Sequence, residues 1–203
     1  TVTLYAVWGE PQSVTDGLVL NLSKWSATSS TWYDISGNGY DMTMTTAIPS
    51  IKGGYIYNSA FNGSSTKSLS LTSAITLEAD VTTGSANNGL LYIFGDYYNG
   101  GCALRTDGTR FQFVINIDGT EVKIEATSTW TANTNYHLVG TYDGSEAKLY
   151  INGQLINSVA TTGSITSSTA SKVLVGAGYS SATNITYNYT GSIHKIKVFN
   201  RAL

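Results

Sequence analysis

The chain has 203 residues and a formal net charge of −2, and only 12% of its residues are charged. This length suits one large β-domain that buries a full hydrophobic core without cross-links. The sparse charge provides no basic stripe for a phosphate backbone, so we do not expect a nucleic-acid partner. Cys102 is the only cysteine, which excludes an internal disulfide and a cysteine-based metal site. No apolar run approaches the roughly 18 residues that span a bilayer, so we expect no membrane insertion.

The first ten residues read TVTLYAVWGE. They resemble the closing strand of a bacterial surface B-repeat of the Listeria-Bacteroides type, which reads V-T-L-Y-A-x-W. Residues 11–16, which include Pro11, are then the expected linker, and residues 17–203 form the main domain. The resemblance implies a modular bacterial cell-surface protein, in which the main domain is a monomeric unit of a larger multidomain chain.

From residue 17 onward, apolar residues recur at period two, and Gly with Asn or Asp interrupts the pattern about every eight to twelve residues. This pattern predicts an all-β protein, a two-sheet antiparallel jelly-roll β-sandwich. The predicted strands are 17–22, 41–44, 55–61, 68–71, 75–81, 90–95, 102–106, 110–117, 120–126, 136–142, 147–151, 154–160, 172–177 and 191–199.

The hairpin over residues 110–126 shows the alternation clearly. Phe111, Phe113, Ile115 and Ile117 share the predicted core face, while Gln112, Val114 and Asn116 share the opposite face. Asp118-Gly119 is a tight-turn dipeptide. We interpret the alternating Glu121, Lys123 and Glu125 of the return strand as a solvated face with cross-strand pairing.

Several phrases occur in the order found in one family. They are GLVLNL (17–22), WYDISGNGYDMTM (32–44), FNGSSTKSLSL (61–71), ITLEADV (75–81), LYINGQL (149–155) and GSIHKIKVFNRAL (191–203). Together they resemble the laminin-G-like domains of the concanavalin A-like lectin and glucanase jelly rolls. The resemblance implies the fold, but this fold includes sugar binders, protein binders, glycosidases and spacers.

The loop Asp34-Ile35-Ser36-Gly37-Asn38-Gly39-Tyr40-Asp41 is a candidate calcium site. Asp34, Asn38 and Asp41 offer the oxygen ligands that Ca²⁺ prefers. The resemblance implies a structural calcium closed by an acidic residue of the last strand, but His194 and Lys195 stand there in this chain. The alternative is that Asp34 caps the turn, so that no cofactor is needed.

Glycosidases of this fold carry a Glu-x-Asp-x-Glu strand, and only Glu78-Ala79-Asp80 comes close to it. Thr82 stands where the proton donor would be, so we expect no catalysis. His137 and His194 have no serine or cysteine elbow near them in the sequence, and we interpret both as structural or exposed.

The loop Asp96-Tyr97-Tyr98-Asn99 is the candidate sugar site. Aromatic faces contact the apolar side of a pyranose, and Asp and Asn bind its hydroxyls. Tyr179, Tyr187 and Tyr189 form a possible second wall, and Trp25 and Trp32 are comparable candidates, whereas Trp130 is interpreted as structural.

We therefore expect a non-catalytic binding or adhesion module of a secreted or surface-anchored bacterial protein, with a glycan or host cell-surface ligand as its partner. One alternative is a protein-protein or spacer module of an adhesin or phage fibre. A second is a glycoside hydrolase or lyase that depends on Glu78.

Overall fold

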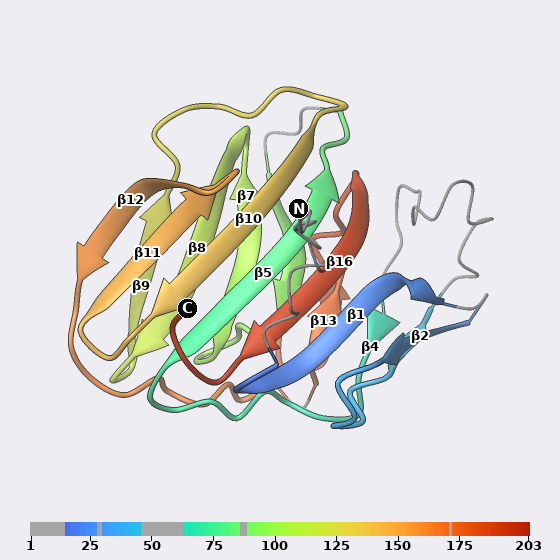
Figure 1. Ribbon diagram of the computed structural model, residues 1–203, viewed down its shortest axis with the longest axis horizontal. Coiled ribbons are helices and arrows are strands. Elements are labelled where there is room, and N and C mark those ends of the chain that lie inside the picture. The colour runs from blue at the N-terminus through green and yellow to red at the C-terminus, as the bar shows by residue number, and fades with distance from the viewer. Residues whose placement is uncertain (1–14, 28–29, 46–62, 86–88, 171) are drawn as a thin grey trace, which may run out of the picture.

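A computed structural model describes residues 15–27, 30–45, 63–85, 89–170 and 172–203, without the side chains of residues 24–27. The expected B-repeat strand, most of the expected linker and the predicted strand 55–61 lie outside these residues. The described part is all-β and antiparallel, as predicted (Figure 1). None of its segments is a helix that could cross a membrane.

Fourteen strands form one hydrogen-bonded series that folds into two layers. In spatial order they are β12 (Gln154–Ala160), β11 (Glu146–Ile151), β10 (Asn135–Tyr142), β5 (Ile75–Thr82), β16 (Ser192–Phe199), β1 (Leu18–Ala27), β2 (Thr31–Asp34), β3 (Met42–Met44), β4 (Gly63–Ser64), β13 (Leu174–Val175), β6 (Leu90–Gly95), β7 (Cys102–Asp107), β8 (Arg110–Ile117) and β9 (Thr120–Glu125). A separate pair consists of β14 (Gly178–Tyr179) and β15 (Ile185–Thr186).

The front layer runs from β12 to β1, and the back layer runs from β13 to β9 (Figure 1). Strands β2, β3 and β4 join the two layers along one side, where two separate sheets were expected. On the other side, Asn157 Nδ2 of β12 donates a hydrogen bond to the carbonyl of Glu125 in β9 at 2.9 Å. The sheet therefore nearly closes on itself, which protects its edges from pairing with other chains.

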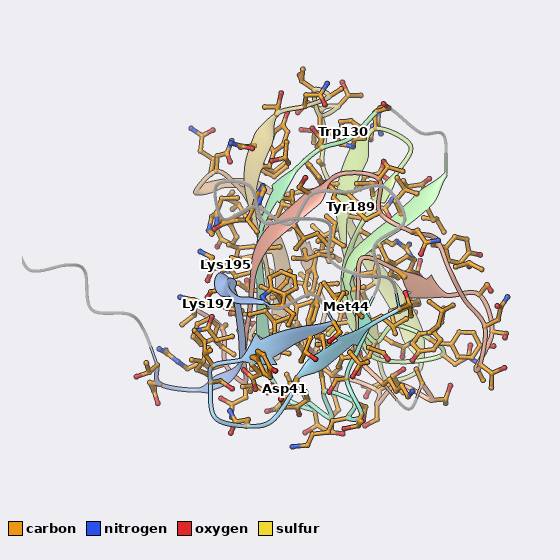
Figure 2. All side chains as sticks on the ribbon, turned by 90° about the vertical axis from the view of Figure 1, so that its right-hand side faces the viewer. Asp41, Met44, Trp130, Tyr189, Lys195 and Lys197 are labelled. Carbon is orange, nitrogen blue, oxygen red and sulfur yellow. The ribbon has the colours of Figure 1, made fainter. Side chains whose placement is uncertain are left out.

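The core lies between the layers because apolar side chains alternate along each strand. Phe113 and Ile115 of β8, Leu77 and Ala79 of β5, and Leu149 of β11 all belong to one buried cluster. Figure 2 shows Trp130 at the opposite end of the sandwich from Asp41. Trp130 packs on Phe111 with ring centroids 6.3 Å apart, which agrees with its structural interpretation.

Two differences from the predicted strands have local causes. Residues 68–71 are not a strand: Ser70 has a φ of 47°, and the Leu69 N–H donates to the Asp96 carboxylate at 3.2 Å. Strand β2 was not predicted, and its Trp32 is fully buried, with Nε1 donating to the Ser23 carbonyl at 2.6 Å. Trp32 is thus a core residue and not a candidate for ligand contact.

Candidate functional site

A cavity of about 390 Å³ is walled by tyrosine rings. It is lined by Tyr92, Tyr97, Tyr98, Asn99, Asn116, Gly119, Glu121 and Tyr179. Pockets for small molecules typically enclose about 300–1,000 Å³ and combine aromatic walls with a few polar groups. This cavity falls at the small end of that range.

The floor of the cavity is the outer face of the back layer. Along β8, Phe113 and Ile115 point into the main core, so Val114 points to the other side. Val114, Ala103 and Tyr92 form a small buried cluster of their own, against which Tyr97 packs. The loop between β6 and β7 therefore folds down over the outer surface of the sheet.

Unusual backbone conformations shape this loop. Asn99, Gly100 and Gly101 have φ values of 48°, 141° and 78°, which favour glycine and asparagine. The Tyr98 N–H donates to the Gly100 carbonyl at 3.0 Å, and the Gly101 N–H donates to the Thr166 carbonyl at 2.7 Å. The loop is thereby fixed to the segment that precedes β13.

Asp96 is buried and does not line the cavity. The residue is 2% exposed, and its carboxylate accepts the backbone N–H groups of Leu69 and Cys102, each at 3.2 Å. Burial raises the pKa of Asp96 to about 6, against the lowering effect of these hydrogen bonds. Asp96 was expected to contact ligand, but here its contacts support the loop that carries Tyr97, Tyr98 and Asn99.

The expected second wall is only partly brought to the cavity. Tyr179 lines it, with its ring 6.3 Å from that of Tyr98. Tyr187 does not line it but packs on Tyr92, with ring centroids 5.9 Å apart. Tyr189 is 3% exposed and belongs to the core cluster.

The polar end of the cavity is the β8–β9 hairpin, where Asn116 and Glu121 are directly paired across the strands. Burial raises the pKa of Tyr97, and so does its hydrogen bond to the Glu121 carboxylate. Arg105 lies next to this group, with Nη2 3.8 Å from Glu121 Oε1. Its guanidinium carbon lies 5.6 Å from the Tyr92 ring centroid and 5.8 Å from that of Tyr97.

The sequence did not identify Tyr92, Asn116 or Glu121 as site residues. Strand alternation placed Asn116 on the face opposite the core, but it did not show that a tyrosine-bearing loop covers that face. Glu121 was interpreted as part of a solvated, cross-strand-paired face. One signal in the sequence is that two polar residues of the outer face, Asn116 and Glu121, lie on either side of the Asp118-Gly119 turn. A polar face at a turn could have been considered together with the loop that carries two adjacent tyrosines.

The acidic groups of the Asp34 to Asp41 loop accept hydrogen bonds, most of them from within the loop. Asp34 Oδ1 accepts the N–H groups of Asn21 and Ser36, both at 2.9 Å, while Oδ2 accepts the Ser36 hydroxyl at 2.8 Å and the Tyr40 N–H at 3.0 Å. Asp41 Oδ1 accepts the Asp34 N–H at 2.8 Å.

The remaining expected ligand of this loop, Asn38, also makes contacts in the turn. Asn38 donates its amide to the Leu18 and Val19 carbonyls, and the Lys67 ammonium lies 2.6 Å from the Asn38 carbonyl. Asp34 and Asp41 thus already accept hydrogen bonds in the turn, and a cation lies beside Asn38. The calcium site stays a prediction, and an ion bound there would have to replace some of these contacts.

Residues 52–203 match the family model of the concanavalin A-like lectin/glucanases superfamily, laminin G type. The chain belongs to this superfamily. No curated protein sequence gives a significant match.

Solved structures share the fold of this laminin G-type domain. The binding domain of botulinum neurotoxin serotype G has a TM-score of 0.65 at 20% identity, covering 92% of this chain and 48% of its own. A Trypanosoma rangeli sialidase in complex with sialic acid has a TM-score of 0.64 at 19% identity, covering 100% and 33%. The binding domain of botulinum neurotoxin DC in complex with SialylT has a TM-score of 0.64 at 16% identity, covering 94% and 50%. The chain thus spans a third to a half of these proteins.

Because the superfamily includes glucanases, the paired carboxylates of this laminin G-type domain need a structural account. Glu78, Asp80 and His137 place ligand atoms within 4.8 Å of one another on the outer face of the front layer. Lys195 bridges the two acids, with Nζ 2.7 Å from Glu78 Oε1 and 2.9 Å from Asp80 Oδ2. Figure 2 shows Lys195 and Lys197 on the same flank of the domain.

Ion pairing in this cluster also shifts the pKa values of His137 and Asp80. His137 Nδ1 lies 2.5 Å from Asp80 Oδ1, and this hydrogen bond raises the pKa of His137. Burial works to raise the pKa of Asp80, but the hydrogen bonds of His137 and Lys195 outweigh it and lower the pKa to about 2. The cluster is therefore an ion-pair network, in which an ammonium group already occupies the place between the carboxylates.

Proposed function

We propose that this chain is a non-catalytic carbohydrate-binding module and that the tyrosine-walled cavity holds the sugar. The observation that carries the proposal is the combination, in one cavity of about 390 Å³, of tyrosine rings with the side chains of Asn99, Asn116 and Glu121. An aromatic ring contacts the apolar face of a pyranose, and amide and carboxylate groups bind its hydroxyls.

The comparisons support this proposal at the level of the fold. The superfamily includes lectins, one similar structure is a neurotoxin binding domain in complex with SialylT, and another is a sialidase in complex with sialic acid. Those ligands belong to those proteins, because identity below 25% relates only the folds. The case for this chain therefore depends on its own cavity.

The ion-pair network supports the non-catalytic part. A glycosidase acid must hold a proton near neutral pH, which requires a raised pKa. Asp80 has a pKa of about 2, and Lys195 holds both it and Glu78. A carboxylate that stays ionised and paired cannot serve as the proton donor.

We further propose that the module acts in adhesion at a bacterial cell surface. The support is the resemblance of residues 1–10 to the end of a surface B-repeat. A lectin-like domain after such a repeat would present its cavity outside the cell.

A glycan array tests the function. The chain should bind a defined set of glycans, and Tyr98→Ala should weaken that binding at least tenfold, because a sugar ring then loses an aromatic face. Tyr33→Ala is the matched control, since Tyr33 is 46% exposed on β2 and does not line the cavity. The same glycans incubated with the protein should show no new reducing ends.

Three results would count against the proposal. Unchanged binding in Tyr98→Ala would move the site away from the cavity. Binding to no glycan would favour a protein-protein or spacer module. Release of reducing ends that stops in Glu78→Gln would show an enzyme.

A further inference from the structure

The cavity has an uneven distribution of charge. Of its lining residues, Glu121 alone is charged, and its side chain is 43% exposed. The other lining residues are tyrosine, asparagine and glycine. A ligand in the cavity therefore meets one carboxylate, which Arg105 faces at 3.8 Å, and no lining cation.

Arg105, a cation next to the cavity, is already committed to protein partners. Its side chain is 7% exposed. Nε donates to Gln112 Oε1 at 2.8 Å, and Nη1 donates to the Tyr92 hydroxyl at 2.9 Å. The guanidinium faces the Tyr92 and Tyr97 rings, and Nη2 faces Glu121. An anionic ligand would have to break these contacts to reach it, and a buried hydrogen-bonded charge is costly to separate from its partners.

Two side chains of the cavity lining offer acceptor oxygens to ligand donors. Asn116 is 6% exposed, and among the described residues its Oδ1 has no hydrogen-bond partner. Buried polar atoms are normally paired, so this covered but unpaired oxygen indicates a place for a donor once the side chain turns toward the cavity. Glu121 provides a second acceptor, and carboxylates make charge-assisted hydrogen bonds with hydroxyl donors.

We propose that the cavity selects an uncharged sugar ring and discriminates against sialic acid and other acidic sugars. Hydroxyl or amide N–H groups of the ligand donate to Glu121 and Asn116, and the tyrosine rings contact its apolar face. A ligand carboxylate meets Glu121 as a like charge with no lining cation to offset it, which is unfavourable. This inference depends on the proposed carbohydrate-binding function and gives its ligand class.

The test is an array that carries each neutral oligosaccharide beside its counterpart capped with one sialic acid. The neutral member of a bound pair should bind at least tenfold more tightly than the capped member. Equal or tighter binding of the capped members would overturn the inference and leave the carbohydrate-binding function in place. Binding to neither set would overturn both.

A variant separates charge from shape. Glu121→Gln keeps the size of the side chain but removes its charge. It should weaken the binding of neutral glycans about threefold to tenfold. It should also reduce the ratio of the affinity for a neutral glycan to the affinity for its capped counterpart. Glu146→Gln makes the same change in β11 of the front layer, outside the cavity, and should leave affinity and ratio unchanged. An unchanged ratio in Glu121→Gln, with the fold confirmed by thermal unfolding, would overturn the role of this carboxylate.

Discussion

Asp96 is a single carboxylate on which the cavity loop depends. It is buried, and it holds the backbone of Leu69 and Cys102 by hydrogen bonds. Its pKa of about 6 in the folded chain lies above the ordinary value of 3.8. The folded protein therefore binds a proton at Asp96 in a pH range where the unfolded chain does not.

This difference predicts how stability depends on pH. Between about pH 4 and pH 6 the folded state holds more protons at Asp96 than the unfolded state, so the contribution of Asp96 to the free energy of unfolding should fall as pH rises. A difference of about two pKa units corresponds to about 3 kcal/mol. Asp96→Asn removes the titrating group and should flatten this part of the curve, as measured by chemical denaturation between pH 4 and pH 7.

Two other groups act outside this window. Asp80 has a lowered pKa of about 2, so its stabilisation is present above pH 4 and is lost as pH falls toward 2. His137 has a raised pKa, so its contribution to the free energy of unfolding is present below about pH 6.5 and is lost as pH rises through its folded value.

The natural chain and Asp96→Asn should therefore differ in how their free energies of unfolding change between pH 4 and pH 6. Parallel changes in the two proteins would contradict the raised pKa of Asp96.

At the residue scale, the sequence predicted the aromatic half of the cavity better than its polar half. Tyr97 and Tyr98 stand out because they are adjacent aromatic residues in a glycine-rich loop, where alternation cannot bury both. Asn116 and Glu121 lie in ordinary alternating strands, and their role arises only when the loop folds over them. Asp96 could not be assigned to a buried position, because its partner Leu69 is 27 residues earlier.

At the scale of the element, the loop between β6 and β7 contains glycines that are restricted in two ways, and Gly101 is one of them. Gly101 has a φ of 78°, and a Cβ there would collide with Asp96 Oδ1 and lie 2.9 Å from Ser168 Cβ. Gly153, in the β11–β12 turn, has a φ of 79° and no atom near a Cβ. Substituting each of these two glycines by alanine therefore separates the free-energy cost of the backbone conformation from the cost of steric crowding.

Gly153→Ala should lower the free energy of unfolding by about 1 kcal/mol, because alanine is strained at positive φ. Gly101→Ala should lower it by about 2–4 kcal/mol, since overpacking adds to the same backbone cost. Urea denaturation of both variants gives the comparison. Equal losses would show that the loop can move away from Asp96 without penalty.

The same contrast explains which elements the sequence could predict. The bounds of β6, β8 and β12 match the predicted strands. Strand β8 alternates and β6 is an unbroken apolar run, and turn residues bound all three. Strand β2 is four residues long and follows no clear alternation, so its pairing with β1 and β3 defines it. Residues 68–71 have the composition of a strand, but their backbone binds Asp96.

At the scale of the whole molecule, the two layers are held in register by contacts between strands that are distant along the chain. A Cβ at Gly140 of β10 would lie 2.5 Å from the ring of Phe113 in β8, on the opposite layer. Phe113 is fully buried. Gly140 therefore leaves space for an aromatic ring from the facing layer, a pairing that no local sequence pattern reveals.

This packing predicts strong coupling between the two positions. Gly140→Ala should lower the free energy of unfolding by about 1–3 kcal/mol, because the added methyl group forces the Phe113 ring out of place. Phe113→Leu should also destabilise, since it leaves part of the core unfilled. The double variant should lose less unfolding free energy than the sum of the two single losses, by about 1 kcal/mol or more, because the smaller side chain makes room for the methyl group.

The control combines Gly140→Ala with Phe94→Leu. Phe94 is a buried residue of β6, two strands from β8, so the losses of these two variants should add. Additive losses for Gly140→Ala with Phe113→Leu, measured by the same denaturation, would mean that the layers do not meet at this contact.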